Sequence, residues 1–181
     1  MSRMREWVPV STSPKGRLAL AAVRAFGARP FAEVTVGELS SAAKVTTGAL
    51  YHHFGSKLGL YAFVRDDVER RLLDRMEGAI AASAPAPDHS AAVRAALLVG
   101  FDFAAREGFL HILGAPPAGA HSDRLADLLS ARTAPASPVL GRVLAAAWRA
   151  ALIAVADGSE PGQARAALLA LDVRETMGGG G

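Results

Sequence analysis

The sequence predicts an all-α protein of about nine helices, with a three-helix head at the N-terminus and a larger helical body behind it. The 181 residues are rich in alanine, leucine and arginine, and only 6% are aromatic, which favours helices over strands. Clusters of proline and glycine interrupt the chain at short intervals, and apolar residues recur at helical spacing between them. Strand signals are almost absent.

The same pattern divides the chain into four segments. Residues 1–13 have no helical period and predict a flexible arm, whereas the run of glycines at the end predicts a disordered tail over 177–181. We expect a helix-turn-helix head over 14–60 and a helical body over 61–176. The length is sufficient for the body to bury a sizeable core.

The first two helices of the head have clear boundaries. A helix is expected from Lys15 to Ala28, and the pair Arg29-Pro30 ends it because a residue before proline is pushed out of the α region. The second helix starts at Thr35, where Glu38 follows three residues later and completes a capping box.

A short helix and then a long one follow. We expect the short helix over 46–54, with Leu50 and Phe54 facing inward. Ser56 caps the long helix, which should run over 57–82 with Leu60, Val64, Val68 and Leu72 inside. The charged residues Arg65, Asp66, Glu69 and Arg70 are expected on its solvated face.

Later proline and glycine breaks divide the body into shorter helices. The expected spans are 90–106, 108–113, 121–132, 139–156 and 163–175.

Charge is distributed unevenly along the chain. Residues 1–65 carry nine Lys and Arg against three Glu, a net charge of +6, whereas the remainder carries eleven basic and fourteen acidic residues, a net charge of −3. A basic head suits contact with a polyanion, and an acidic body is repelled by one.

Composition excludes several classes of protein and site. The absence of cysteine excludes a disulfide framework, a thiolate zinc site and a cysteine nucleophile. His52 and His53 are adjacent, so on a helix they point about 100° apart and cannot readily chelate one metal ion. We expect no metal and no cofactor.

Hydropathy predicts a soluble, cytoplasmic protein without a membrane partner. No apolar run reaches the roughly 20 residues that span a bilayer. Residues 1–10 also lack the apolar stretch of a secretory signal.

Residues 35–54 have the layout of a helix-turn-helix: a supporting helix, a tight turn and a short helix with a polar outer face. The outward residues of the short helix are Thr47, Gly48, Tyr51 and His52. Small residues at its first turn let the backbone approach base edges, and the helix dipole favours phosphate there. Tyrosine and imidazole can donate hydrogen bonds to phosphate oxygens.

The run from Val45 to Lys57, Val-Thr-Thr-Gly-Ala-Leu-Tyr-His-His-Phe-Gly-Ser-Lys, resembles the DNA-binding head of tetracycline-repressor (TetR) family regulators. With its flanks, the resemblance covers roughly 15–64. It implies a homodimeric repressor that binds double-stranded operator DNA and is released by a small-molecule effector, which is unidentified. The implied base contacts are Thr46, Thr47 and Gly48, with Thr47 as the main reader. The implied phosphate contacts are Thr35, Tyr51, His52, His53 and Lys57.

Three residues depart from the family pattern. Pro30 stands where a glycine usually ends the first helix, so that corner must be built differently. Lys44 stands where glycine is common in the turn; a positive φ there costs on the order of 1 kcal/mol, which a phosphate contact would offset, so Lys44 is also a DNA-binding candidate. Gly59 replaces the acidic residue that would complete a capping box with Ser56.

Two body helices are expected to form the dimer interface that the resemblance implies. Small and apolar residues form a stripe along 139–156 and 163–175, and part of this stripe must also serve the monomer core. Its members are Leu140, Val143, Leu144, Ala147, Trp148, Ala151, Leu152, Val155, Ala164, Ala167, Leu168 and Leu171. The effector pocket would be lined by Phe101, Phe103, Phe109, Ile112 and Trp148, with Asp102, His111 or Arg149 orienting the ligand. Aromatic residues at this spacing also suit a plain core.

Alternative functions remain open at this point. An effector-independent or architectural DNA-binding protein would share the head but have a well-filled body. An enzyme using His111, His121, Asp123 or Asp127 has little support, because the sequence contains no catalytic triad order, HExxH or phosphate-binding glycine loop. A membrane-surface protein would need bulky apolar residues on an amphipathic face of the head, which is absent.

Overall fold

The computed structural model describes residues 12–83, 89–117, 123–133 and 137–171. Within these ranges the chain forms nine α-helices and one 3₁₀ helix, and no strand. The all-α prediction is confirmed. The elements are α1 (Pro14–Ala28), η1 (Phe31–Glu33), α2 (Val36–Ala42), α3 (Thr47–Phe54), α4 (Lys57–Ala82), α5 (His89–Glu107), α6 (Leu110–Gly114), α7 (Arg124–Ser130), α8 (Pro138–Ala156) and α9 (Pro161–Leu169).

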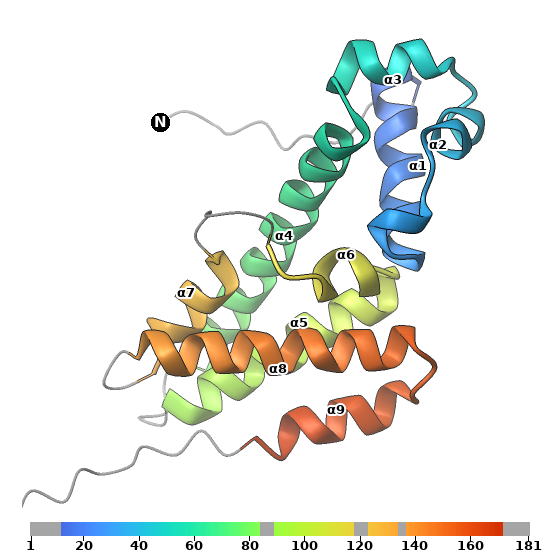
Figure 1. Ribbon diagram of the computed structural model, residues 1–181. Helices are drawn as coiled ribbons and strands as arrows, with labels where there is room; N and C mark the ends of the chain where they lie inside the picture. Colours follow the sequence, from blue (N-terminus) through green and yellow to red (C-terminus); the bar gives the residue numbers. More distant parts are fainter. Residues whose placement is uncertain (1–11, 84–88, 118–122, 134–136, 172–181) are drawn as a thin grey trace, which may run out of the picture.

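Helices α1, α2 and α3 form a head at one end of the long helix α4, and α4 continues from the head into the body (Figure 1). In the body α4 packs along α5, and α8 lies across α6 and α7. Helices α8 and α9 run beside each other at the end of the molecule farthest from α3 (Figure 1).

Side-chain caps start the helices where the sequence predicts them. Thr35 accepts a hydrogen bond from the backbone N–H of Glu38, and the Glu38 carboxylate accepts one from the backbone N–H of Thr35, so the predicted capping box is present. Ser56 accepts from the N–H of Gly59 at the start of α4. These contacts satisfy N–H groups that have no partner within their helix.

The head has a continuous apolar core shared with α4. Leu18, Leu39, Leu50 and Leu60 are at most 1% exposed. An aromatic group closes the lower end of this core, where the Tyr61 ring contacts Phe26 and Phe31 edge-on at 5.0 Å between centroids. The head and the start of α4 are thus packed as one unit.

The head also contacts the body through backbone. A Cβ atom added at Gly27, in α1, would lie 2.3 Å from the carbonyl oxygen of Gly108, in the turn between α5 and α6. Only glycine permits this approach. The end of α1 therefore rests directly on the turn that precedes α6.

Several predictions need correction or fall outside the described ranges. Arg65 is not on a solvated face: it is 9% exposed and buried between α4 and α6. The predicted helices 121–132 and 163–175 are shorter, because Asp123 caps α7 and α9 ends at Leu169. Most of the predicted arm (residues 1–11), the predicted tail (177–181) and residues 172–175 lie outside the described residues.

Candidate nucleic-acid interface

The turn between α2 and α3 sets the direction of α3. Lys44 has a φ of 53°, the only positive φ of a non-glycine residue in the described ranges. Lysine therefore adopts the positive φ considered for it at this position, where glycine is common. The Lys44 and Val45 N–H groups donate to the carbonyl oxygens of Ser41 and Ser40, at 3.0 Å each. These bonds turn the chain sharply while Ala43 stays buried beneath it.

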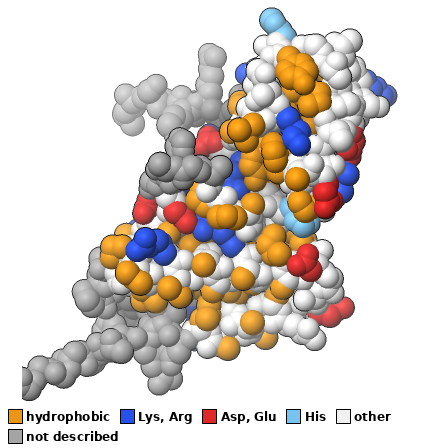
Figure 2. Space-filling model, in the orientation of Figure 1, with side chains coloured by type: hydrophobic (Ala, Val, Ile, Leu, Met, Phe, Trp, Pro, Cys, Tyr) orange, Lys and Arg blue, Asp and Glu red, His pale blue; other side chains and the backbone are white. Residues whose placement is uncertain are grey.

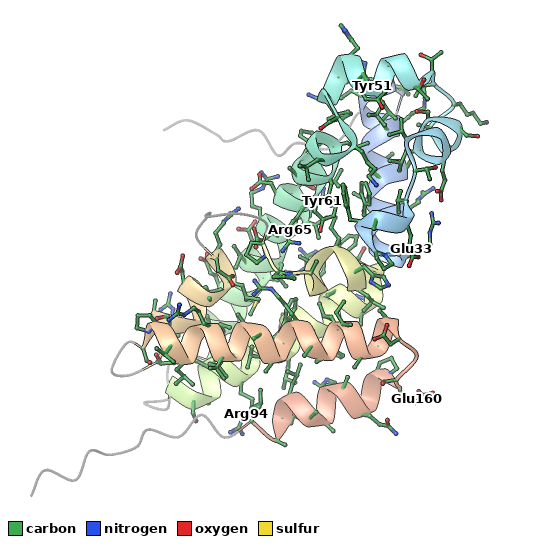
Figure 3. All side chains as sticks on the ribbon, viewed as in Figure 1. Glu33, Tyr51, Tyr61, Arg65, Arg94 and Glu160 are labelled. Atoms are coloured by element: carbon green, nitrogen blue, oxygen red, sulfur yellow. The ribbon has the colours of Figure 1, made fainter. Side chains whose placement is uncertain are left out.

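The outer face of α3 is open to solvent, as predicted. Thr46, Thr47, Gly48 and His52 are exposed, His53 is half-buried, and Tyr51 is 53% exposed although it is a large aromatic residue. Tyr51 lies at the end of the molecule farthest from α8 and α9 (Figure 3). On the opposite face Leu50 is fully buried.

The first turn of α3 exposes backbone donors. Thr46 uses its hydroxyl as the cap, accepting from the N–H of Ala49 at 3.2 Å. The N–H groups of Thr47 and Gly48 precede the first intrahelical bond and so point out of the helix end. An exposed helix N-terminus with small side chains can receive an anionic oxygen.

Two of the predicted phosphate ligands already have partners within the head. The Thr35 side chain is engaged in the capping box of α2. The Lys57 ammonium donates to the carbonyl oxygens of Phe31 (2.9 Å) and Val34 (2.8 Å) and lies 4.1 Å from the centre of the Phe31 ring. Lys57 therefore also fixes the linker between α1 and α2, a role that no local pattern in the sequence predicts.

Arg65 is a functional candidate that the sequence analysis put on the wrong face. Its guanidinium donates to the Tyr61 hydroxyl (3.0 Å) and to the carbonyl oxygens of Ile112 (2.9 Å) and Ala115 (2.7 Å). It lies on α4 between the head and the body (Figure 3). The helical period was the signal that could have placed Arg65 on the buried face. Arg65 follows Tyr61 by four residues, and residues four apart lie on the same face of a helix.

A second buried arginine forms an ion pair inside the body. Arg149 of α8 donates from both terminal nitrogens to Asp123, at 2.7 Å each, while its Nε is buried without a partner among the described residues. Burial alone would raise the pKa of Asp123. The hydrogen bonds from Arg149 and from the N–H of Ala126, with the charges of Arg149 and Arg65, outweigh it and lower that pKa below its usual value.

The predicted effector-lining side chains are core residues in this structure. Phe101, Phe103, Phe109 and Trp148 are at most 7% exposed, and the Trp148 indole donates to the carbonyl oxygen of Leu97 at 3.0 Å. Of the proposed orienting groups, Asp102 pairs with Arg165 of α9, and His111 is half-buried.

The described residues contain no group of three His, Asp or Glu side chains that could hold a metal ion. One helix, α8, is long and apolar enough to cross a membrane by length and composition alone, with a mean hydropathy of 1.7. A core helix of a soluble protein passes the same test, and α8 buries Trp148 and Leu152 against the rest of the body.

Comparison with known proteins identifies the head. Residues 19–63 match the model of the bacterial regulatory proteins of the tetR family. No curated protein matches the sequence.

A solved structure resembles most of this chain in fold. A TetR-family transcriptional regulator from Pectobacterium atrosepticum aligns over 87% of this chain and 89% of its own, with 23% identity and a TM-score of 0.59. The TetR family repressor AlkX from a Dietzia strain, implicated in biodegradation of n-alkanes, aligns over 88% and 93% with 15% identity. Its TM-score is 0.44. The head therefore matches the tetR-family model over residues 19–63, and the chain has the fold of a TetR-family transcriptional regulator.

Proposed function

We propose that the chain is a transcriptional repressor that binds a palindromic DNA operator as a homodimer and releases it when a small molecule binds the body. The observation that carries this proposal is the outer face of α3, which lies at the tip of the basic head (Figure 1) and exposes Thr47, Gly48, Tyr51 and His52. A helix presented in this way can enter the major groove of DNA.

Each exposed group has a distinct task in this proposal. Thr47 and Gly48 are at the first turn, where short side chains allow contact with base edges, and Thr47 is the principal reader. Tyr51 and His52 donate to phosphate oxygens on the flanking strand. The remaining contacts to base edges or phosphates come from Thr35, Lys44, Thr46, His53 and Lys57.

Dimerisation is proposed through α8 and α9, because each carries an apolar face that the monomer leaves open. Val139 and Val143 on α8 are 62% and 56% exposed, and Leu169 on α9 is 41% exposed. Figure 2 shows hydrophobic side chains gathered over these two helices, with few charges among them. The exposed small residues between them are Ala146, Ala150, Ala166, Ala167 and Ala170.

The paired faces suit a four-helix interface between two copies. A dimer is also what operator recognition requires, since one short helix reads too few base pairs alone. Part of the predicted stripe, including Leu144, Trp148, Leu152 and Leu168, is monomer core and leaves the outer alanines and valines for the partner.

Release by an effector is proposed as a population shift. A molecule that prefers one arrangement of the body would alter the spacing of the two α3 helices. The contacts available to transmit such a change are the Arg65 bonds to α6 and the approach of Gly27 to Gly108. The first joins α4 to α6, and the second joins the end of α1 to the turn before α6.

An effector-independent DNA-binding protein is the second candidate. The close packing of Phe101, Phe103, Phe109 and Trp148 favours it, since a filled body needs no ligand for stability. Thermal unfolding with a library of small molecules separates the two, because a true effector raises the melting temperature and lowers operator affinity together. In either case the protein would act in the cytoplasm.

The proposal is tested by selecting DNA duplexes from a random pool with the purified chain. The expected product is an inverted repeat with half-sites centred about 10 base pairs, or a multiple of that, apart. Thr47→Ala should change the preferred base at one position of each half-site, whereas Ser159→Ala, at an exposed turn far from the head, should select the same sequence. Enrichment of no sequence, or identical sequences from the Thr47 variant, contradicts the proposal.

A further inference from the structure

A groove of about 530 Å³ lies between α1 and α2 on the head. Its floor is apolar, formed by Leu20 and Leu39 with Ala21, Ala25 and Ala42. The alanines explain why space is left between the helices, because their side chains are too short to fill it. Ala42 is exposed and Leu39 is buried, so the groove opens to solvent above a closed base.

Contacts between the two helices fix the width of the groove at both ends. At one end the Arg17 Nε donates to the carbonyl oxygen of Ala43 at 2.9 Å. At the other end Arg29 forms an ion pair with Glu38, which is also held by the capping box of α2. The groove is therefore formed before any occupant arrives, which lowers the entropic cost of binding.

The charge around the groove has one dominant sign. Four cationic side chains line it, those of Arg17, Arg24, Arg29 and Lys44, against the Glu38 carboxylate, which Arg29 already neutralises. Arg24 and Lys44 are exposed, and neither side chain has a hydrogen-bond or ion-pair partner among the described residues. Two unpaired cations thus stand beside an apolar floor.

We propose that this groove binds a free amphiphilic anion, a carboxylate on a single alkyl chain. The chain lies on the alanine and leucine floor, and Arg24 and Lys44 bind the carboxylate. The volume is within the range of small-molecule sites, about 300 to 1,000 Å³. A folded protein partner needs a far larger surface, about 800 Å² from each partner, and a DNA backbone has no alkyl group to cover the floor.

This site is separate from the body and does not depend on the effector proposed there. It adds a consequence for DNA binding that does rest on the proposed function. Lys44 lines the groove and is also a proposed phosphate ligand, so an occupant would withdraw its charge from DNA.

Isothermal titration of the full chain with dodecanoate tests the site without DNA, so its result is independent of operator binding. The comparison ligand is dodecyltrimethylammonium, which has the same alkyl chain and the opposite charge, and both are kept below micelle-forming concentrations. Dodecanoate should bind with one site per chain, and the ammonium compound should bind at least about tenfold more weakly.

Two variants locate the site. Arg24→Glu should weaken dodecanoate binding by about tenfold or more, whereas Arg106→Glu, the same change at an exposed position of α5, should alter it by less than about twofold. Ala42→Phe places a ring in the groove from an exposed position and should abolish binding while thermal unfolding shows the head still folded. The proposal is overturned if dodecanoate does not bind, if Arg24→Glu and Arg106→Glu bind it equally, or if the ammonium compound binds as tightly.

Discussion

Arg65 of α4 donates a hydrogen bond from Nη1 to the carbonyl oxygen of Ile112 in α6, at 2.9 Å, and both residues are buried. The same guanidinium reaches Ala115 at the end of α6. Because α4 begins inside the head, this one side chain connects the helix-turn-helix to the body.

Arg65→Met should lower the free energy of unfolding by about 2 to 4 kcal/mol, since it leaves buried carbonyl oxygens without a donor. Arg70→Met is the control: Arg70 pairs with Asp67 on the same helix but is 40% exposed, and its loss should cost less than about 1 kcal/mol. Urea unfolding measures both. Equal losses in the two variants would mean that the buried Arg65 hydrogen bonds stabilise the protein no more than a surface ion pair does.

Gly59→Ala should destabilise the corner between α3 and α4. An added Cβ atom would lie 2.1 Å from the carbonyl oxygen of Phe54, so the two helices must move apart, at a cost of about 1 to 3 kcal/mol. Gly37→Ala in α2 has nothing within 4 Å of the new Cβ and should instead stabilise by up to about 1 kcal/mol through helix propensity. Thermal unfolding of both variants checks the prediction, which fails if they shift the melting temperature in the same direction.

Lys44→Gly should act on stability and DNA affinity in opposite directions. Glycine adopts a φ of 53° without the steric cost that lysine pays, so the free energy of unfolding should rise by about 1 kcal/mol. Removing a phosphate-binding charge should lower the slope of log affinity against log salt by about one. Fluorescence anisotropy at several salt concentrations measures the slope, and an unchanged slope would exclude Lys44 from the interface.

Val143→Glu should convert the dimer to monomer. Val143 is 56% exposed in the chain alone, so the substitution leaves the fold intact but puts a charge into the proposed interface. Val99→Glu, at 39% exposure on α5, makes the same change outside that interface and should stay dimeric. Light scattering after size exclusion gives both masses. A monomeric wild-type chain, or a dimeric Val143 variant, would rule out this interface.

Asp123 should make stability depend on acid pH. Its pKa is lowered in the folded protein, so its contribution is fully present above the unfolded value, about 3.9, and is lost as the pH falls through the folded value. Between pH 5 and pH 3, therefore, wild type should lose more unfolding free energy than Asp123→Asn, in which the amide still caps α7 but cannot titrate. Parallel pH profiles would show that the Arg149 pair contributes nothing.

The predictable parts of the fold depended on local signals. Thr35 with Glu38, and Ser56 with Gly59, are close in sequence, so the starts of α2 and α4 could be read directly. The structure also shows the local backbone at two of the departures from the family pattern. Lys44 has a positive φ, and Gly59 lies close to a backbone carbonyl oxygen.

Contacts between residues far apart in sequence could not be predicted. Arg65 meets carbonyl groups about fifty residues away, and Lys57 meets carbonyls more than twenty residues before it. A charged residue among other charged residues looks solvated until the partner helix is known. The groove between α1 and α2 was likewise invisible, because its alanines and arginines are typical of exposed helix faces.

Affinity for DNA tests the proposed role of α3 most directly. The full chain should be titrated with DNA from upstream of its own gene and with a shuffled duplex of the same composition, at about 50 and 200 mM salt. A sequence reader keeps a clear preference for one palindrome at the higher salt, because base contacts do not depend on counterion release. Equal binding to both duplexes that disappears at the higher salt would mean that the basic head contacts phosphates alone and that α3 reads no sequence in that DNA.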